Sequence, residues 1–463
     1  MIGAALLALL FGAVSARAQE APKAEPAQPA AQEPPTATAG TEQTPAGAVS
    51  DEDQTPSSTE QGHTQMDDSF DRRPVLAILH ESRLVGIRDT TFNAQLRSFY
   101  RHLDSFDDDE SLAWTLGGSV GVKTGYFWNR VALGATGYTS QPIYAPYDKD
   151  GTQLLLPQQH PYSVLGELYG EFLLTDTVKA SVGRRAYVTP YINTDDSRMT
   201  PATFQAYAVQ GTLGGGGDPV VRFGAGYVDK EKDRNSEEFV PMSTVAGAPA
   251  AVQRGVCAAG GNVSSGGLRI GVIDYYSIDI INIAYTEAKY TYALSNRMRL
   301  LFSAQYASQA STGNNLLTGH PFSTDQFGLK AELGLGGMLL TAAYTGTGNG
   351  ANMQNPWGAY PGYTSVQIEN FYRAGEDAAM LRAAYNFSSV RGLSAYALYV
   401  NGSKPDSPKQ YAQDEYDLNV QWVAGTGRLK GLTLLARYGH VSQDGGGNPH
   451  EDDFRLVLYY NLL

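Results

Sequence analysis

The segment RRAYVTPYINTDDSRMTPA, residues 184–202, stands between two stretches in which apolar and polar residues alternate, 164–183 and 203–211. An irregular insert of this length inside a compact domain usually forms a lid or a binding loop. It carries three arginines and two aspartates. If the flanking stretches are strands of a β-barrel, the loop can fold inward and place its charges at the narrowest point of a pore. We therefore expect an antiparallel barrel with an inward-folded constriction loop.

Alternation with a period of two continues from residue 92 to the C-terminus in segments of about ten residues, the length that a tilted strand needs to cross a bilayer. In the first segment Phe92, Leu96 and Tyr100 alternate with Arg97 and Arg101, so we expect the apolar set to face lipid and the polar set to face the lumen. In the fourth, Val164 and Leu168 are expected to point outward. By length sixteen strands also fit, but we predict eighteen: 92–101, 112–123, 130–136, 164–172, 178–183, 203–210, 220–228, 255–261, 268–276, 281–293, 298–308, 324–334, 338–345, 378–387, 393–400, 415–423, 432–439 and 454–462.

The connections between these segments alternate in length, which is typical of bacterial outer-membrane barrels with short periplasmic turns and long external loops. One external connection, after Tyr276, is short. The short connections are 175–177, 211–219, 295–297, 334–337, 388–392 and 424–431, and the long ones are 141–162, 229–254, 309–323 and 346–376.

Composition agrees with an all-β membrane protein. After the N-terminal region, the 463-residue chain has no run of 18 apolar residues, which excludes membrane-spanning helices. The 29 tyrosines and 51 glycines suit aromatic girdles and tightly packed, twisted strands, although a soluble β-sandwich could show the same excess. A net charge of -13 argues against nucleic-acid binding. The single cysteine, Cys257, allows no internal disulfide and is expected to be a small buried residue.

The N-terminal region divides into three parts. Residues 1–18 have an apolar core and end in Ala16-Arg17-Ala18, the pattern of a signal-peptidase site, although the usual basic start is missing. Residues 19–70 are rich in Pro, Ala, Gln and Thr and predict a disordered periplasmic extension, or an arm that binds peptidoglycan or another periplasmic partner. Residues 71–91 are a lead-in segment, and the barrel is expected over 92–463.

Several short motifs around the loop resemble the third-loop region of the OprD-type porins. They are Tyr169-Gly170-Glu171-Phe172, Val182-Gly183-Arg184-Arg185, residues 189–193 and residues 195–204. The resemblance implies an outer-membrane porin of a Gram-negative bacterium with eighteen strands. It also implies a row of basic side chains for substrate carboxylates. Arg97, Arg382 and Arg437 stand in sequence contexts that look like those of the family.

The pore-lining candidates follow from the facing of the strands, because a charge that faced lipid near the midplane would cost about 2–4 kcal/mol. The alternative is that the strand arginines only form salt bridges with lumen-wall acids, for which the candidates are Glu167, Glu171, Glu287, Glu332 and Asp417. In the loop, the alternative is that Asp196 and Arg198 only lock the loop's own fold and leave specificity to the width of the pore. The candidates are Arg97, Arg101, Lys123, Arg130, Arg222, Arg299, Arg382 and Arg437 on the strands, and Arg184, Arg185, Tyr187, Asp195, Asp196 and Arg198 near the loop; the strand set also includes Lys330.

The sequence offers little for catalysis or for a bound cofactor. The glycine run 214–217 lacks the Lys-Ser/Thr ending of a phosphate-binding loop. Residues 148–151 match half of a calcium loop without its closing Glu, and the seven histidines show no metal-binding spacing. We expect no enzyme activity, no cofactor and no metal.

Together these patterns predict a passive, substrate-selective porin for small carboxylates, amino acids or short peptides. A general diffusion porin, an outer-membrane enzyme and an envelope-tethering protein are the alternatives. The expected partners are small anionic or zwitterionic solutes, outer-membrane lipid and lipopolysaccharide, and the chain is expected to be a monomer or a trimer.

Overall fold

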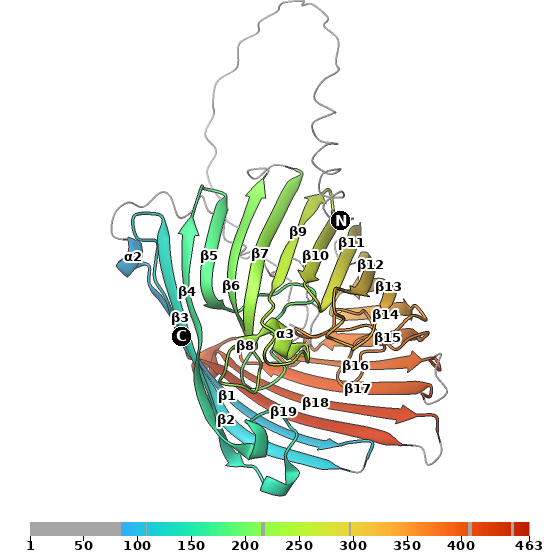
Figure 1. Ribbon diagram of the computed structural model, residues 1–463. Coiled ribbons are helices and arrows are strands. Elements are labelled where there is room, and N and C mark those ends of the chain that lie inside the picture. The colour runs from blue at the N-terminus through green and yellow to red at the C-terminus, as the bar shows by residue number, and fades with distance from the viewer. Residues whose placement is uncertain are drawn as a thin grey trace, which may run out of the picture. The chain divides into compact units, whose positions relative to one another are not determined.

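The computed structural model describes residues 85–107, 109–213, 218–295, 298–405, 410–445 and 449–462. The predicted signal peptide, the extension and most of the lead-in segment lie outside these residues. Within them, one antiparallel sheet of nineteen strands closes on itself, because β1 pairs with both β2 and β19 (Figure 1). The strand β8 has two residues and pairs with β7, so eighteen strands form the barrel wall. The prediction of eighteen strands is confirmed.

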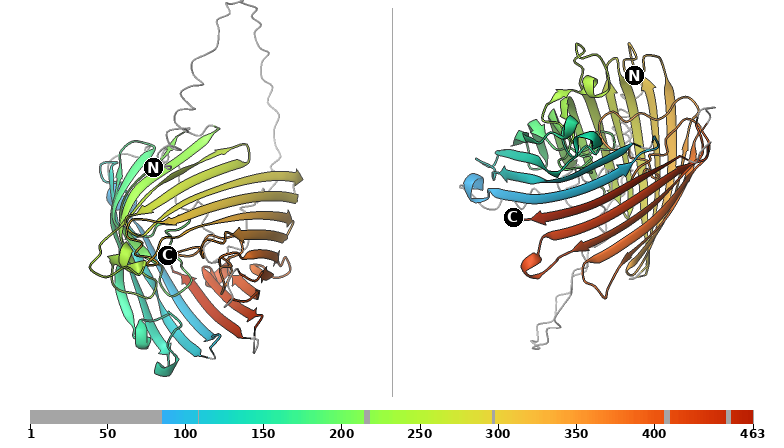
Figure 2. Two further views of the ribbon diagram at one scale, coloured as in Figure 1. Left: turned by 45° about the vertical axis from the view of Figure 1, so that its right-hand side comes forward. Right: turned by 90° about the horizontal axis from the view of Figure 1, so that it is seen from below.

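The wall strands run in chain order around the ring, and Figure 2 shows the ring from two further sides. The short helices are α2 (Val85–Arg88) and α3 (Met242–Val245), with single turns at Tyr147–Lys149, Pro157–Gln159 and Gly427–Leu429. No helix among the described residues is long and apolar enough to cross a membrane. The strands are β1 Thr91–Asp104, β2 Glu110–Lys123, β3 Val131–Tyr144, β4 Tyr162–Leu173, β5 Val178–Arg185, β6 Thr203–Leu213, β7 Val220–Lys232, β8 Val240–Pro241, β9 Val256–Ser265, β10 Leu268–Ser277, β11 Ile281–Ser295, β12 Met298–Ser311, β13 Ser323–Leu335, β14 Met338–Thr347, β15 Asp377–Asn386, β16 Leu393–Gly402, β17 Gln413–Val423, β18 Leu432–Gln443 and β19 His450–Asn461.

The two faces of the wall differ in the way that the alternation predicts. Large apolar side chains on the outer face are open, as at Val120 (69% exposed) and Leu381 (66% exposed). Side chains on the inner face are covered, as at Phe99 and Val457. An outer surface this apolar is stable only against lipid, because water would leave a very large apolar patch exposed.

Two expectations about the wall are wrong. Leu165 and Leu168 point outward, and Val164 does not, because the register shifts at Gly166 and this bulge reverses the alternation along β4. Cys257 is exposed and not buried. It lies on the outer face of β9, level with the exposed side chains of Tyr227 and Tyr276, because the alternation along the strand turns it to that face.

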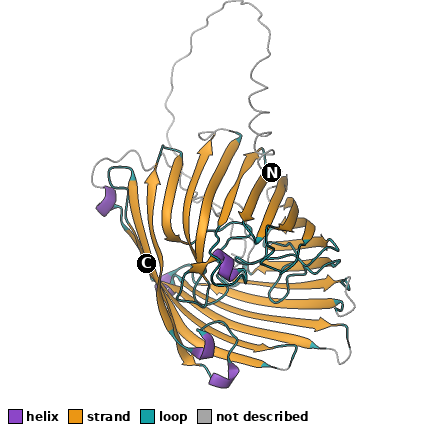
Figure 3. Cartoon of the chain, viewed as in Figure 1, coloured by secondary structure: helices purple, strands orange, loops and turns teal. Residues whose placement is uncertain are grey.

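Inside the ring, buried apolar side chains from loops pack against the inner face of the strands from β6 to β12. Tyr191 and Ile192 come from the 186–202 loop, Met242 from the 233–255 connection, and Trp357 and Tyr360 from the 348–376 loop, and all five are buried. Figure 3 shows these loops gathered within the ring of strands. The loops therefore form a packed plug rather than loose external segments.

Candidate functional site

The 186–202 loop spans the lumen, because it is bonded to opposite parts of the wall. The Asp196 carboxylate accepts two hydrogen bonds from Arg97 on β1, at 2.7 and 2.9 Å. The Tyr191 N–H donates to the Tyr275 hydroxyl on β10, at 3.2 Å. These strands lie about half a turn apart in the ring. The loop thus narrows the channel as the sequence predicts.

A second loop, 348–376, completes the constriction. The Asn193 side chain donates to the Ala359 carbonyl at 2.9 Å and accepts from the Ala359 N–H at 2.8 Å. Gly358 has a positive φ of 135°, and a Cβ there would lie 2.7 Å from the Asn193 Oδ1. Only glycine lets the two backbones approach this closely. Sequence reasoning identified 346–376 only as a long external loop; its dense aromatic residues were the available signal that it packs inside.

A row of arginines crosses three neighbouring strands on the inner wall. Arg455 on β19 is paired in register with Arg101 on β1 and with Arg437 on β18, and all three are nearly buried. Asp453 lies beside them and accepts hydrogen bonds from Arg101 (2.7 Å) and from Arg455 (2.5 Å). We call Arg101, Arg455 and Arg437 the arginine row. Arg455 was missed as a candidate. The signal for it was available, because Leu456 faces outward and its neighbour Arg455 must then face the lumen.

Tyrosine and arginine side chains continue the row along the wall. The Arg437 Nη2 donates to the Tyr396 hydroxyl at 3.1 Å. The Arg382 guanidinium lies 4.1 Å above the same ring, in a cation–π contact. Guanidinium groups therefore follow one another from β1 to β15, which is the direction in which a carboxylate could pass from one to the next.

Arg198 is placed by the constriction loop close to this row. It donates to the Ser197 carbonyl and to Gln153, and it makes no ion pair with any residue that the structure describes. Its Nε is buried without a hydrogen-bond partner. Burial, together with the nearby charges of Arg101, Arg234 and Arg455, lowers the pKa of Arg198. A guanidinium in such surroundings is stabilised by an approaching anion.

Both loop aspartates are already paired with arginines. Asp196 pairs with Arg97, as described above, and Asp195 forms an ion pair with Arg234 from the 233–255 connection. Asp195 also accepts a hydrogen bond from the Ser197 hydroxyl at 2.8 Å. These contacts hold the shape of the loop, and Arg234 is a partner that sequence reasoning missed.

A second charged group lies on the turn side of the constriction, around the buried carboxylate of Glu171. Arg185 (2.8 Å), Lys123 (3.2 Å) and Lys179 (3.4 Å) all form ion pairs with it. Tyr187 is nearby and shares a hydrogen bond with Ser181 at 2.9 Å. Arg185 and Lys123 are therefore brought together by one acid, away from the arginine row.

The other expected acids have different partners. Glu287 and Glu332 pair with lysines on their own strands, Lys289 (3.0 Å) and Lys330 (3.3 Å). Glu167 accepts from the Tyr138 hydroxyl, and Asp417 accepts from the Gln367 N–H of the second loop. Asp453, which was not among the expected partners, forms ion pairs with Arg101 and Arg455.

The remaining candidates lie away from the constriction. Arg184 is paired with Leu168, which is 54% exposed on the outer face, and it stacks on Phe239, so it points out of the barrel. Arg130 is exposed in the turn between β2 and β3 and donates to the carbonyls of residues 173 and 174. Arg222 and Arg299 lie near the turn ends of β7 and β12.

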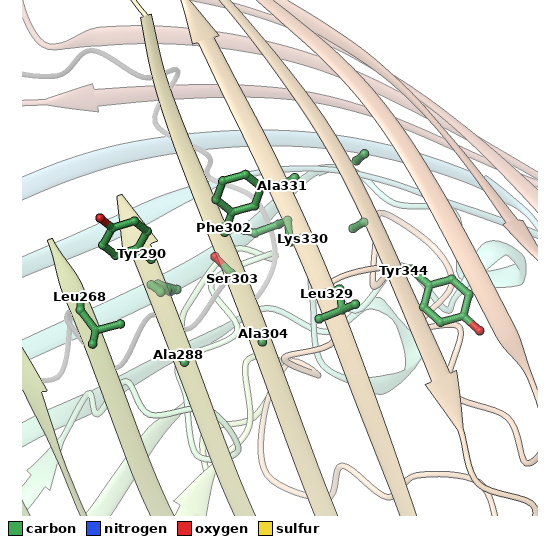
Figure 4. A pocket seen from close by; sticks show the side chains of 13 residues that line it. Leu268, Ala288, Tyr290, Phe302, Ser303, Ala304, Leu329, Lys330, Ala331 and Tyr344 are labelled. Atoms are coloured by element: carbon green, nitrogen blue, oxygen red, sulfur yellow. The ribbon is translucent and has the colours of Figure 1, made fainter. Parts of the chain in front are cut away.

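A hollow of about 520 Å³ lies against the wall between β10 and β14 (Figure 4). Tyr290, Phe302, Leu329 and Tyr344 surround it and are exposed on the outer face. It is an apolar depression in the lipid-facing surface and has no part in the constriction.

A family model described as outer membrane porin, OprD family, matches residues 87–463. The chain belongs to the OprD family. Members of this family are channels of the Gram-negative outer membrane and not enzymes, so the chain is a porin. No curated protein matches it in sequence.

Solved structures of OprD-family porins share the fold. OccK9 (OpdG) of Pseudomonas aeruginosa superimposes with a TM-score of 0.72 at 21% identity, covering 81% of this chain and 99% of that one. OccAB2 of Acinetobacter baumannii gives 0.70 at 18% identity, with 82% and 99% covered. OpdK of Pseudomonas aeruginosa, solved with vanillate, gives 0.69 at 19% identity, with 81% and 99% covered.

Proposed function

We propose that this OprD-family porin takes up small carboxylates, amino acids or short peptides, and that the arginine row and Arg198 bind the carboxylate as it passes the constriction. The observation that carries the proposal is the register of Arg101, Arg455 and Arg437, three guanidinium groups on adjacent strands, with the carboxylate of Asp453 paired to two of them. Arginine forks bind carboxylates in a bidentate manner. A solute carboxylate that meets the row replaces its hydration with paired hydrogen bonds.

Only some of the charged side chains near the constriction contact the solute directly. Arg97, Asp195 and Asp196 act as supports that hold the constriction loop, because their charges are already paired with one another or with Arg234. Arg382 extends the path on the far side of Tyr396. Arg185 and Lys123 form ion pairs with Glu171. Arg184 points out of the barrel and does not contact the solute.

Vanillate in the OpdK structure is an aromatic carboxylate. We extend that solute class to this chain because a guanidinium row suits any small carboxylate, whereas a neutral sugar gains little from it. The same proposal puts the barrel in the outer membrane of a Gram-negative bacterium, with lipid and lipopolysaccharide against the exposed apolar face.

Liposome swelling with arginine, benzoate and glucose tests this function. The parent is expected to admit benzoate and arginine faster than glucose. The double variant Arg198→Ala with Arg437→Ala is expected to lose that preference, by about tenfold for benzoate if the lost charge-assisted hydrogen bonds contribute about 1.5 kcal/mol. Arg184→Ala, which removes an outward-facing arginine, is the matched control and is expected to behave as the parent.

A general diffusion porin is the competing function. Equal uptake of the three solutes by the parent and by both variants would favour it, because pore width alone would then set the rates.

A further inference from the structure

Three of the seven histidines come together where the barrel closes, although they are far apart in the sequence. His102 lies on β1, and His440 and His450 lie on β18 and β19. The register places Glu110, Asp104, Asp452 and His440 in one row across β2, β1, β19 and β18. β1 and β19 are the first and last strands, so the row crosses the seam of the barrel. We call these six side chains the seam cluster: His102, Asp104, Glu110, His440, His450 and Asp452.

The seam cluster lies on the outer face of the wall, at the rim that carries the loops. Tyr100 is paired with Trp114 and with Leu456, which are 43% and 44% exposed on the outer face. His102 and Asp104 follow Tyr100 by two and four residues, so they share its face. The cluster is therefore separate from the arginine row, which lines the inner face.

Half of the cluster has the geometry of a metal site. The His102 Nε2 lies 2.9 Å from the Glu110 Oε1 and 3.6 Å from the Asp104 Oδ1. In the part of the chain that the structure describes, this is the one set of three potential ligand side chains whose ligand atoms all lie within 4.8 Å of one another. A tetrahedral ion with bonds of 2.0–2.2 Å needs ligand atoms about 3.4 Å apart. Small side-chain rotations reach that arrangement.

The other half stands directly across the seam. The His440 Nδ1 lies 2.9 Å from the Asp452 Oδ1, and the His450 Nε2 lies 3.8 Å from the Asp452 Oδ2. Asp104 and Asp452 are cross-strand partners, and two like charges in that position destabilise a sheet. Lys149 offsets part of the negative charge, because its Nζ lies 2.5 Å from the Glu110 Oε2.

We propose that the seam cluster binds a zinc ion, held by His102, Asp104 and Glu110, with Asp452 facing the ion from the other side of the seam. Imidazole nitrogen together with carboxylate oxygen suits zinc better than calcium or magnesium, which prefer oxygen alone. The three ligands leave one tetrahedral position for water or for Asp452. Lys149 competes with the ion for Glu110. Zinc at this place joins the first two strands to the last and stabilises the closure of the barrel.

The test measures zinc binding by the full-length protein in detergent, with ZnCl₂ as the probe and a chromophoric chelator as competitor. The parent is expected to bind zinc at a site that His102→Ala weakens by about tenfold or more, since changes around metal sites commonly cost 10–100-fold in affinity. Zinc is also expected to raise the thermal unfolding midpoint of the parent and to leave that of His102→Ala unchanged. His320→Ala, which removes a loop histidine outside the cluster, is the matched control and keeps the binding of the parent.

The variant Lys149→Met distinguishes a metal site from a network of salt bridges. If Lys149 competes with zinc, the variant is expected to bind zinc several times more tightly, whereas a purely structural network would only be weakened. This arm does not depend on a disruptive change, and circular dichroism confirms that each variant is folded. The proposal is overturned if the parent binds no zinc, if His102→Ala binds it as the parent does, if Lys149→Met binds it more weakly, or if calcium competes equally well. Transport is not measured, so the result does not depend on the proposed function.

Discussion

At the scale of single residues, one carboxylate determines whether the arginine row can exist. Asp453 is fully buried and bonds both Arg101 and Arg455. Without it, the buried guanidinium groups of Arg101 and Arg455 would lose the ion-pair partner that they share, and their mutual repulsion would be less well offset. The row is therefore a partly compensated site, positive enough to attract an anion and sufficiently paired to fold.

Replacing Asp453 with asparagine is expected to destabilise the barrel by about 3–5 kcal/mol, because breaking a buried ion pair leaves uncompensated charge. Urea unfolding in lipid vesicles, followed by tryptophan fluorescence, measures the change. Asp148→Asn, at an exposed acid of the 145–161 connection, is the control and should alter the free energy of unfolding by less than about 0.5 kcal/mol. If Asp453→Asn lowered the free energy of unfolding as little as the control does, the arginine row would not need Asp453 for stability.

Adjacent arginines show what the sequence could not determine at this scale. Arg184 and Arg185 were both expected at the constriction, but neighbouring residues of a strand point to opposite faces. The register of β5 with Leu168 decides which of them faces inward, and that pairing depends on Gly183, where a Cβ would lie 2.3 Å from the Leu168 carbonyl oxygen. The sequence Arg184-Arg185 by itself does not indicate which of the two side chains faces inward.

At the scale of elements, the strands and the inward fold of the 186–202 loop were predictable, and the packing of that loop against the 348–376 loop was not. A period of two gives most strands their type and faces from local residues, and eighteen such segments can be counted. The choice of eighteen over sixteen rested on the resemblance to the OprD-type porins. The bulge at Gly166 was not visible, because it exists only relative to the partner strand. The contact of Asn193 with Ala359 joins residues 166 positions apart, and no local pattern encodes it.

The close contact of Asn193 with Gly358 and Ala359 joins the two loops and should control the width of the channel. Gly358→Ala is expected to force the loops apart, since its Cβ would lie 2.7 Å from the Asn193 Oδ1, and so to raise single-channel conductance and weaken solute preference. Gly247→Ala is the matched control, because Gly247 also has a positive φ (83°) but nothing lies within 4 Å of its Cβ position. If Gly358→Ala and Gly247→Ala have the same single-channel conductance, the contact between the two loops does not set the width of the channel.

At the scale of the whole molecule, the net charge does not describe the charges at the constriction. The chain carries -13, yet the inner wall at the constriction presents arginines. Charges on the rim are screened over about 8 Å at physiological salt, whereas nearly buried ones are screened much less. The field that a solute meets in the narrow part is thus set by a few residues and not by the total.

This difference predicts that the channel prefers anions in spite of its acidic composition. The zero-current potential across a planar bilayer in a KCl gradient is expected to have the sign of chloride selectivity. The preference should persist between about 0.1 M and 1 M salt, because the arginines of the constriction are largely shielded from bulk ions. Cation selectivity at both concentrations would mean that the acids of the loops dominate.

The central claim is that the arginine row binds passing carboxylates, and block of single-channel current by benzoate tests it most directly. Benzoate is expected to interrupt the current of the parent and of the control Arg184→Gln at the same concentration. Arg437→Gln is expected to need about tenfold more benzoate, as the loss of one charge-assisted contact implies. Equal block of all three proteins would contradict the account.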